Sequence, residues 1–219
     1  MKIFAVIPAY NEAENIEQVI KDILPLVDAV VVVDDASSDK TARVAETAGV
    51  VVLRHLLNRG QGAALRTGSR YAVDQGADII LHFDADGQFS VADIPGLVEP
   101  LKTGEAEIVF GSRFLRDNRL PPMKRYVILP IARLINRLFF NIRLSDPQSG
   151  LRAMTADSFK KIIWSEDQMA HCSEILWLAR ERGLKIKEVP MTVVYHRYGQ
   201  KFGGGFKILR DLFINKLSR

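Results

Sequence analysis

The chain has 219 residues, of which 47% are hydrophobic and 26% are charged. These are globular values that exclude a disordered or fibrous protein, and the length favours one domain with a sizeable core. The formal net charge of +4 hides a division, because residues 1–110 carry 9 basic and 17 acidic residues (net −8) and residues 111–219 carry 21 and 9 (net +12). The basic half predicts an anionic partner: a phosphate, a nucleic acid or an acidic membrane surface.

The first half alternates short β-branched runs with helical patterns. Runs such as 30–33 are apolar on both faces, as in the strands of a buried parallel sheet. This alternation predicts βαβ units in an α/β fold, in which ligands bind beyond the carboxyl ends of the strands. Strands are predicted at 3–8, 29–35, 50–55, 79–84 and 107–113, and helices at 14–24, 41–48, 62–74 and 91–101.

The second half is less regular. Pro121 and Pro122 mark a break, after which a long helical pattern covers about 123–144 and a polar loop covers 145–150. Further helices are predicted at 156–163 and 173–182, a strand at 187–195 and, after the glycine-rich turn at 203–205, a last helix.

Compartment and membrane topology follow from simple features. The one cysteine, Cys172, allows no internal disulfide, which fits a reducing cytoplasm. The first residues do not form a secretory signal, because their apolar run is too short. The longest apolar stretch, 126–135, contains Pro130 and Arg133 and is shorter than the roughly 18–20 residues of a membrane span. We therefore expect a cytoplasmic chain that does not cross a bilayer but is able to lie on one.

Polar residues follow three of the predicted strands. The first strand leads into 8–12, the second ends in 34–39 and the fourth ends in 84–88. Asp84 and Asp86 are two residues apart at a strand end, which predicts that both carboxylates point to one side. With the amide oxygen of Gln88 they suit Mg²⁺ or Mn²⁺, which would in turn bind a nucleoside diphosphate. The alternative is that these carboxylates are simply solvated.

Two other segments at this edge have competing interpretations. Asp35 is expected to point toward a ribose or base, against which Tyr10 and Glu12 would lie, while Ser38 or Asp39 caps the next helix. The glycines at 60 and 62 form an incomplete dinucleotide motif that follows the third strand instead of the first. We interpret them as a tight turn into a closely packed helix.

Six motifs in this order resemble family 2 glycosyltransferases, and within them the dolichyl-phosphate mannose synthases and their polyprenyl-phosphate relatives. The similarity covers nearly the whole chain. The motifs are residues 8–12, 34–37, 84–88, 111–113, the pattern of Asp146, Ser149, Gly150 and Arg152, and Val189-Pro190.

The resemblance implies a GT-A fold, that is, a Rossmann-like, mostly parallel sheet flanked by helices, here with C-terminal amphipathic helices. It also implies a single domain over 1–219, in which 1–110 binds the nucleotide sugar and 111–219 the acceptor. The implied nucleotide-sugar residues are Pro8, Tyr10, Glu12, Val33, Asp35, Asp84, Ala85, Asp86, Arg197 and Lys201. The implied metal ligands are Asp84, Asp86 and Gln88; the catalytic residues are Asp86, Arg113 and Asp146; and the acceptor-phosphate residues are Arg113, Arg125 and Arg133.

The basic half contains two amphipathic patterns, at 123–144 and in the last helix. Basic amphipathic helices fit an anionic membrane surface, although their apolar stripes are equally able to pack on the sheet. No nucleic-acid recognition motif is present, so we expect no nucleic-acid partner.

The expected reaction is a metal-dependent inverting transfer of a sugar from GDP-mannose or a UDP-sugar to a polyprenyl (dolichyl or undecaprenyl) phosphate, at the cytoplasmic face of a membrane. Such a phosphate is largely dianionic at neutral pH, since its second pKa is about 6, and needs positioning more than a base. Asp146 is therefore expected to order the arginines. Two alternatives are a soluble family 2 enzyme acting on a sugar or protein hydroxyl, and a non-catalytic nucleotide-sugar-binding subunit.

Overall fold

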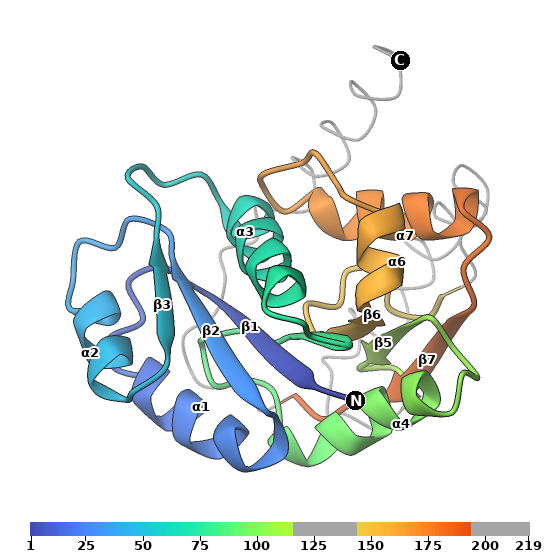
Figure 1. Ribbon diagram of the computed structural model, residues 1–219, viewed down its shortest axis with the longest axis horizontal. Coiled ribbons are helices and arrows are strands. Elements are labelled where there is room, and N and C mark those ends of the chain that lie inside the picture. The colour runs from blue at the N-terminus through green and yellow to red at the C-terminus, as the bar shows by residue number, and fades with distance from the viewer. Residues whose placement is uncertain (116–143, 194–219) are drawn as a thin grey trace, which may run out of the picture.

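The computed structural model describes residues 1–115 and 144–193. Within these ranges the strands form one sheet of seven, in the order β3-β2-β1-β4-β6-β5-β7 (Figure 1). The strands are β1 (Ile3–Ala9), β2 (Ala29–Asp34), β3 (Val51–Arg54), β4 (Ile79–His82), β5 (Ile108–Ser112), β6 (Arg152–Thr155) and β7 (Ile186–Pro190). The sheet thus combines strands from both halves of the chain.

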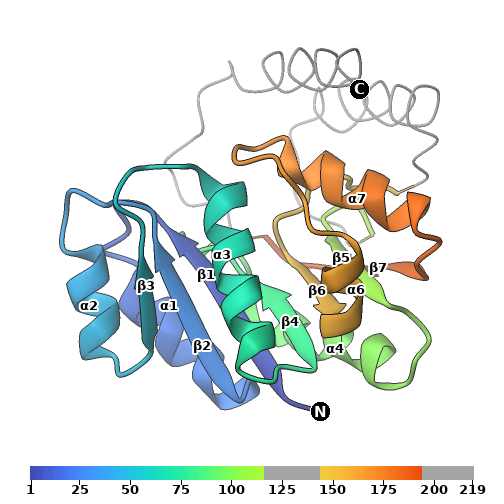
Figure 2. The ribbon, with the colours of Figure 1, turned by 45° about the horizontal axis from the view of Figure 1, so that its top comes forward.

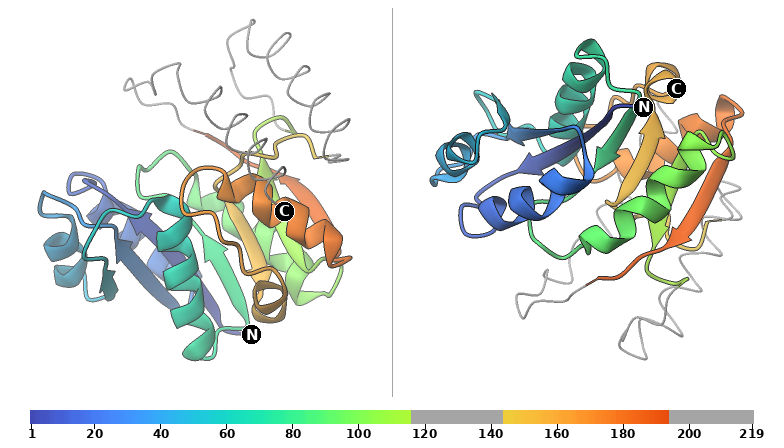
Figure 3. Two further views of the ribbon diagram at one scale, coloured as in Figure 1. Left: turned by 90° about the horizontal axis from the view of Figure 1, so that it is seen from above. Right: turned by 60° about the horizontal axis from the view of Figure 1, so that its bottom comes forward.

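Helices cover both faces of this sheet (Figure 3). The helices are α1 (Ile16–Ile23), α2 (Thr41–Thr47), α3 (Gln61–Asp74), α4 (Ile94–Lys102), α6 (Ala156–Lys161) and α7 (His171–Glu181), with short 3-10 turns at Leu24–Leu26 and Val91–Asp93. Within the described residues, no helix has the length and apolar character needed to cross a membrane.

Alternation along the central strands explains why both faces are covered. In β1, Ala5 and Ile7 pack into one hydrophobic cluster with α1 and α4, whereas Val6 packs into the other with α3, α6 and α7. Strand β2 divides its valines in the same way, with Val30 and Val32 on one side and Val31 and Val33 on the other. A strand buried on both faces needs the continuous apolar run that the sequence shows.

One strand departs from the expected pattern. Strand β6 lies between β4 and β5 and is antiparallel to both, with Arg152 opposite His82 on one side and Phe110 on the other. The sequence analysis predicted no strand here, because an arginine at the start of a four-residue run is atypical of a central strand. The predicted α/β, mostly parallel sheet is confirmed, and β6 is its antiparallel exception.

Most predicted elements are present with shifted ends. Strand β4 ends at His82, so Asp84 and Asp86 lie in the turn after it and not on one face of a strand. Of the predicted strand at 187–195, strand β7 ends at Pro190, and Val193 forms an isolated bridge to Phe89. Residues 194 and 195 lie outside the described residues. The predicted helix at 123–144 (but for its last residue) and the last helix lie outside the described residues.

The turn at Gly60 and Gly62 has the tight packing that we expected in place of a dinucleotide site. Gly60 has a φ of 105°, which favours glycine, and precedes the first residue of α3. A Cβ on Gly62 would lie 2.3 Å from the carbonyl oxygen of Glu166, so helix and loop backbones touch here.

We predict that Gly62→Ala lowers the free energy of unfolding by about 1–3 kcal/mol, because the added methyl group meets backbone that cannot move aside cheaply. Urea denaturation measures the change. Gly96→Ala is the control, because Gly96 lies in α4 with nothing within 4 Å of its added Cβ and gains helix propensity. Equal stability of Gly62→Ala and the wild type would contradict the prediction.

Candidate functional site

The polar segments predicted to converge do meet at one edge of the sheet. Strands β1, β2 and β4 are neighbours and parallel, and Ala9 is opposite Asp34 at their carboxyl ends. Loop contacts join the segments directly: Asn11 N donates to Ser37 Oγ (2.9 Å), and Glu12 N donates to Thr41 Oγ1 (2.8 Å). Pro8 and Val33 are register partners within this edge.

Tyr10 and Glu12 lie in the first of these loops. The Tyr10 side chain is half exposed at the edge of the sheet, with its ring available to an incoming ligand. The Glu12 carboxylate accepts a hydrogen bond from Asn15 Nδ2 at 2.9 Å, so it also shapes the start of α1. The N-cap residue of α2 is Lys40, which makes no side-chain cap hydrogen bond, so the predicted cap at Ser38 or Asp39 is wrong. Asp39 lies one position earlier, where its carboxylate accepts the N–H of Thr41, the first residue of the helix.

Asp35 is buried, and protein groups surround its carboxylate. It accepts the backbone N–H groups of Gly60 (2.6 Å) and Arg59 (3.0 Å) and lies 2.6 Å from His55 Nδ1. His55 Nε2 in turn lies 3.0 Å from Thr67 Oγ1. The carboxylate therefore holds the loop between β3 and α3, a role that the sequence analysis did not predict; its contact with a ribose or base stays a prediction.

Asp84 and Asp86 lie in the turn after β4, where their two carboxylates repel each other. Asp84 Oδ1 accepts Gln61 Nε2 at 2.8 Å, and Asp86 Oδ1 accepts the backbone N–H of Gln88 at 3.0 Å. Burial and the neighbouring Asp86 raise the pKa of Asp84 to about 7. Ala85 between them is buried.

Such a carboxylate pair fits a divalent cation, whose charge would counter the burial and the Asp86 repulsion that together raise the Asp84 pKa. Within the described residues no group of three or more His, Cys, Asp or Glu side chains is arranged to hold a metal. Two carboxylates are nevertheless the number that Mg²⁺ commonly takes from a protein, its other ligands being water and substrate phosphate.

A charged pair from the second half of the chain lies at the same edge of the sheet, because β5 runs parallel to β4 with β6 between them. Arg113 Nε donates to Asp146 Oδ2 (2.6 Å) and Arg113 Nη2 to Asp146 Oδ1 (2.8 Å), a two-pronged pair in which Asp146 is buried and Arg113 is partly exposed. This contact agrees with the expectation that Asp146 orders an arginine, and the catalytic roles of Asp146 and Arg113 stay predictions. Arg125, Arg133, Arg197 and Lys201 lie outside the described residues, so their assignments stay predictions.

Glu188 on β7 fixes the loop that carries Asp146. Its carboxylate accepts the backbone N–H of Ser145 (2.8 Å) and of Asp146 (2.9 Å), together with Ser145 Oγ (3.0 Å). The sequence analysis missed this residue, because the partners are more than 40 positions apart. The sequence had one indication of this role: Glu188 lies beside Val189-Pro190, in a strand whose carboxyl end lies at the same edge of the sheet as the candidate site.

A buried arginine, with a histidine and a cysteine beside it, lies near Asp84 of the acidic turn. Arg152 is fully buried, and its Nη2 lies 3.0 Å from His171 Nε2 and 3.4 Å from Cys172 Sγ. Burial alone would raise the pKa of the Cys172 thiol, but His171 and Arg152 lower it to about 6. Arg152 also opposes the rise in the Asp84 pKa. The acidic turn thus lies in the field of a buried positive charge.

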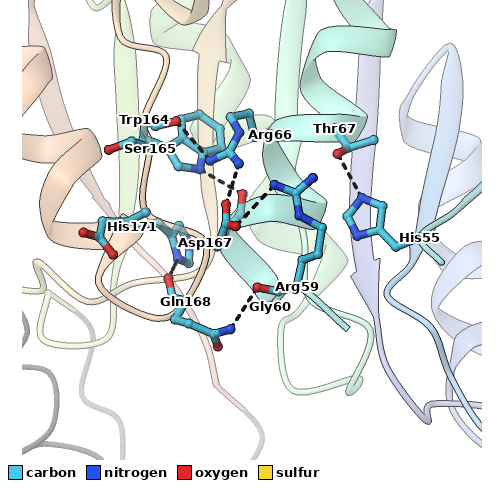
Figure 4. A network of polar contacts seen from close by, with 12 residues as sticks. His55, Arg59, Gly60, Arg66, Thr67, Trp164, Ser165, Asp167, Gln168 and His171 are labelled. Carbon is cyan, nitrogen blue, oxygen red and sulfur yellow. Dashed lines mark hydrogen bonds and ion pairs between the residues drawn. The ribbon is translucent and has the colours of Figure 1, made fainter. Parts of the chain in front are cut away.

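The segment before α7 joins the two halves of the chain (Figure 4). Asp167 pairs with both Arg59 (3.3 Å) and Arg66, and Gln168 Nε2 donates to the carbonyl oxygen of Arg59 at 2.8 Å. Trp164 Nε1 donates to the carbonyl oxygen of Gly62 at 2.9 Å. The loop between β3 and α3 is therefore fixed by Asp35 at the end of β2 and also by residues from the second half of the chain.

The α/β fold, with its mostly parallel sheet of seven strands flanked by helices, is the GT-A fold, which solved structures share with this chain. The chain belongs to the glycosyl transferase family 2, whose model matches residues 4–163. The predicted family and fold class are confirmed.

Curated relatives agree with this assignment. The chain is 32% identical to the UDP-N-acetylglucosamine–dolichyl-phosphate N-acetylglucosaminyltransferase of Methanococcus voltae, over 99% of this chain and 97% of the relative. It is 33% identical to the undecaprenyl-phosphate mannosyltransferase of Micrococcus luteus, over 94% and 89%. An uncharacterised protein of Methanocaldococcus jannaschii is 39% identical, over 99% and 93%.

Solved structures resemble the chain over nearly its whole length. Glucosyl-3-phosphoglycerate synthase of Mycobacterium tuberculosis, in complex with Mg²⁺ and UDP, has a TM-score of 0.76 at 25% identity, and covers 99% of this chain and 78% of that chain. The same enzyme with Mn²⁺, UDP and phosphoglyceric acid has a TM-score of 0.75 at 25% identity, with the same coverage.

We predict that Glu188→Gln lowers the free energy of unfolding by about 1.5–3 kcal/mol, because an amide cannot accept all the donors that the carboxylate accepts. Urea denaturation at neutral pH measures the loss. Glu107→Gln is the matched control: Glu107 is also a carboxylate that accepts a backbone N–H, that of Lys185 at 3.0 Å, but at the opposite edge of the sheet. A loss for Glu188→Gln no larger than for the control would contradict the prediction.

Proposed function

We propose that this family 2 glycosyltransferase moves a sugar from a nucleoside-diphosphate sugar to a polyprenyl phosphate, with inversion at the sugar carbon. The observation that carries the proposal is that the acidic turn at Asp84 and Asp86 and the Arg113–Asp146 pair lie at the same edge of the sheet, after the parallel strands β4 and β5. One group suits a metal-bound diphosphate and the other an anionic acceptor. Two relatives have names that specify transfer to dolichyl or undecaprenyl phosphate.

The donor would bind along the ends of β1, β2 and β4. Tyr10 would offer its exposed ring to the base, and Glu12 its carboxylate to the nucleoside. Asp35, which is buried and accepts the N–H of Gly60, would contact the nucleoside while it holds the β3–α3 loop. Asp84, Asp86 and Gln88 would hold Mg²⁺ or Mn²⁺, which supplies charge neutralisation for the departing nucleoside diphosphate. Solved structures of the same fold contain Mg²⁺ or Mn²⁺ together with UDP, which supports this assignment.

The acceptor would be positioned by Arg113. Its guanidinium is held at two points by Asp146, whose backbone N–H is in turn held by Glu188, so the cation is fixed in direction before the acceptor arrives. A phosphate monoester is largely dianionic at neutral pH and needs no proton removed before it attacks the sugar carbon. The protein therefore contributes to the reaction by placing a fixed positive charge beside the acceptor phosphate and by orienting that phosphate toward the sugar carbon. Arg125 and Arg133 would add to this cationic surface.

We further propose that the enzyme works at the cytoplasmic face of a membrane. The basic half of the chain, with a net charge of +12, would face an anionic lipid surface on which the polyprenyl phosphate is available.

The decisive experiment supplies GDP-mannose, UDP-glucose or UDP-N-acetylglucosamine with Mg²⁺ and a polyprenyl phosphate, and measures transfer of labelled sugar to lipid.

We predict that Asp86→Asn lowers this transfer by at least about 100-fold, because the amide removes a charge that the metal and diphosphate require. Asp78→Asn, at the opposite edge of the sheet, is the control and keeps full activity. Unchanged metal-dependent transfer in Asp86→Asn would refute the metal assignment.

We predict that Arg113→Ala raises the KM for polyprenyl phosphate about tenfold or more, because a charge-assisted hydrogen bond to the acceptor is lost. The affinity for the nucleotide sugar, measured by calorimetry without acceptor, stays within about twofold of the wild type. Weaker nucleotide binding with an unchanged KM for the lipid would place Arg113 at the donor. Transfer to a sugar or protein hydroxyl, with none to lipid phosphate, would favour a soluble family 2 enzyme.

A further inference from the structure

The loop between β3 and α3 presents two adjacent leucines to solvent. Leu56 is 97% exposed and Leu57 is 75% exposed, more than any other large hydrophobic side chain within the described residues. Single exposed hydrophobic residues are common on protein surfaces, but two adjacent ones at this degree of exposure form a contiguous apolar tip.

The loop that carries these leucines is held by hydrogen bonds at both of its ends. On one side His55 N donates to the carbonyl oxygen of Asp34 (2.9 Å). On the other side Asn58 Nδ2 donates to the carbonyl oxygen of Asp35 (3.2 Å), and Arg59 and Gly60 donate to its carboxylate. Leu56 and Leu57 are therefore exposed on a loop whose two ends are held by hydrogen bonds.

The tip lies at the same edge of the sheet as the candidate site. Strand β3 ends at Arg54 opposite Asp34, so the loop begins where the polar segments of β1 and β2 also begin. Figure 2 shows the connection from β3 to α3 at the top of the coloured ribbon, on the same side as the segment before α7. Arg59 and Asp167 join these two connections.

The charges beside the tip favour an anionic partner. The side chains of Arg54 and Arg59, on either side of the leucines, are 62% and 50% exposed. Each lies beside a carboxylate, Asp34 at 3.7 Å and Asp167 at 3.3 Å, and still presents its outer surface to solvent. An apolar tip between two exposed cations has the chemistry of a membrane interface, where leucines enter the acyl boundary and cations stay at the headgroups.

We propose that Leu56 and Leu57 insert into the surface of an anionic bilayer and hold the ligand edge of the sheet against it. The proposal rests on the proposed function, since a polyprenyl phosphate presents its reactive group at that surface. A bilayer needs no complementary shape, whereas a stable protein interface buries roughly 800 Å² per partner, far more than two leucines provide. The lipid surface is therefore the occupant that this tip fits.

The test is co-sedimentation of the full chain with vesicles of phosphatidylcholine and phosphatidylglycerol. We predict that Leu56→Ser/Leu57→Ser lowers the partition constant by about tenfold or more, because the apolar area of two leucines no longer leaves water. The matched control is Leu24→Ser/Leu26→Ser, which changes two partly exposed leucines (41% and 38%) at the opposite edge of the sheet and leaves binding unchanged.

A second measurement does not depend on sedimentation. A polarity-sensitive fluorophore attached to Leu56→Cys, in a chain whose native Cys172 is buried, shifts its emission to the blue when vesicles are added. The same fluorophore on Leu24→Cys does not shift.

Several outcomes would overturn the proposal: no vesicle binding by the wild type, equal loss in both double variants, or no shift from position 56. Weaker nucleotide binding by Leu56→Ser/Leu57→Ser without vesicles would assign the leucines to the donor site, and a dimer that the variant abolishes would assign them to a second copy of the chain. A failure of the proposed function is distinguishable, because it would show as no sugar transfer by the wild type even to a short-chain, water-soluble polyprenyl phosphate.

Discussion

The antiparallel strand β6 is the constraint on which the rest of the site depends. Because it runs opposite to β4 and β5, its amino end lies where their carboxyl ends lie, with Arg152 beside His82. The loop before β6 therefore arrives at the ligand edge, and Gly150 packs directly on Asp84, where any Cβ would come within 2.5 Å of a carboxylate oxygen. A parallel strand in this position would deliver that loop, and Asp146 with it, to the opposite edge.

Negative and positive side chains lie close together at the amino end of β6. Asp84 and Asp86 concentrate negative charge in the turn after β4, and the buried guanidinium of Arg152 partly offsets it. Among the residues that the structure describes, none accepts a hydrogen bond from Nε or Nη1 of Arg152, so its guanidinium is only partly hydrogen-bonded. Desolvated cations are rarely left so incompletely paired, and a highly charged ligand nearby is one situation in which such a field is useful.

Much of the fold and part of the site could be predicted from local patterns. Continuous apolar runs identified the buried strands, and the polar residues after β1, β2 and β4 converge as parallel strands require. Strand β6 could not be predicted, because four residues starting with arginine carry no strand signal. The contacts of Glu188 with Ser145 and of Asp35 with Gly60 could not either, since they join positions 43 and 25 apart and depend on how the elements pack.

By itself, the sequence determined the family, the mostly parallel α/β sheet and the acidic residues at its edge, because hydrophobic periodicity and motif order are local properties of the chain. Only the tertiary structure decided how those residues are used. It tied Asp146 to Arg113, turned Asp35 toward the β3–α3 loop and left Leu56 and Leu57 in solvent. The reason is physical: burial, ion pairing and exposure depend on which distant segments come together, and that is fixed by packing and not by neighbours in the sequence.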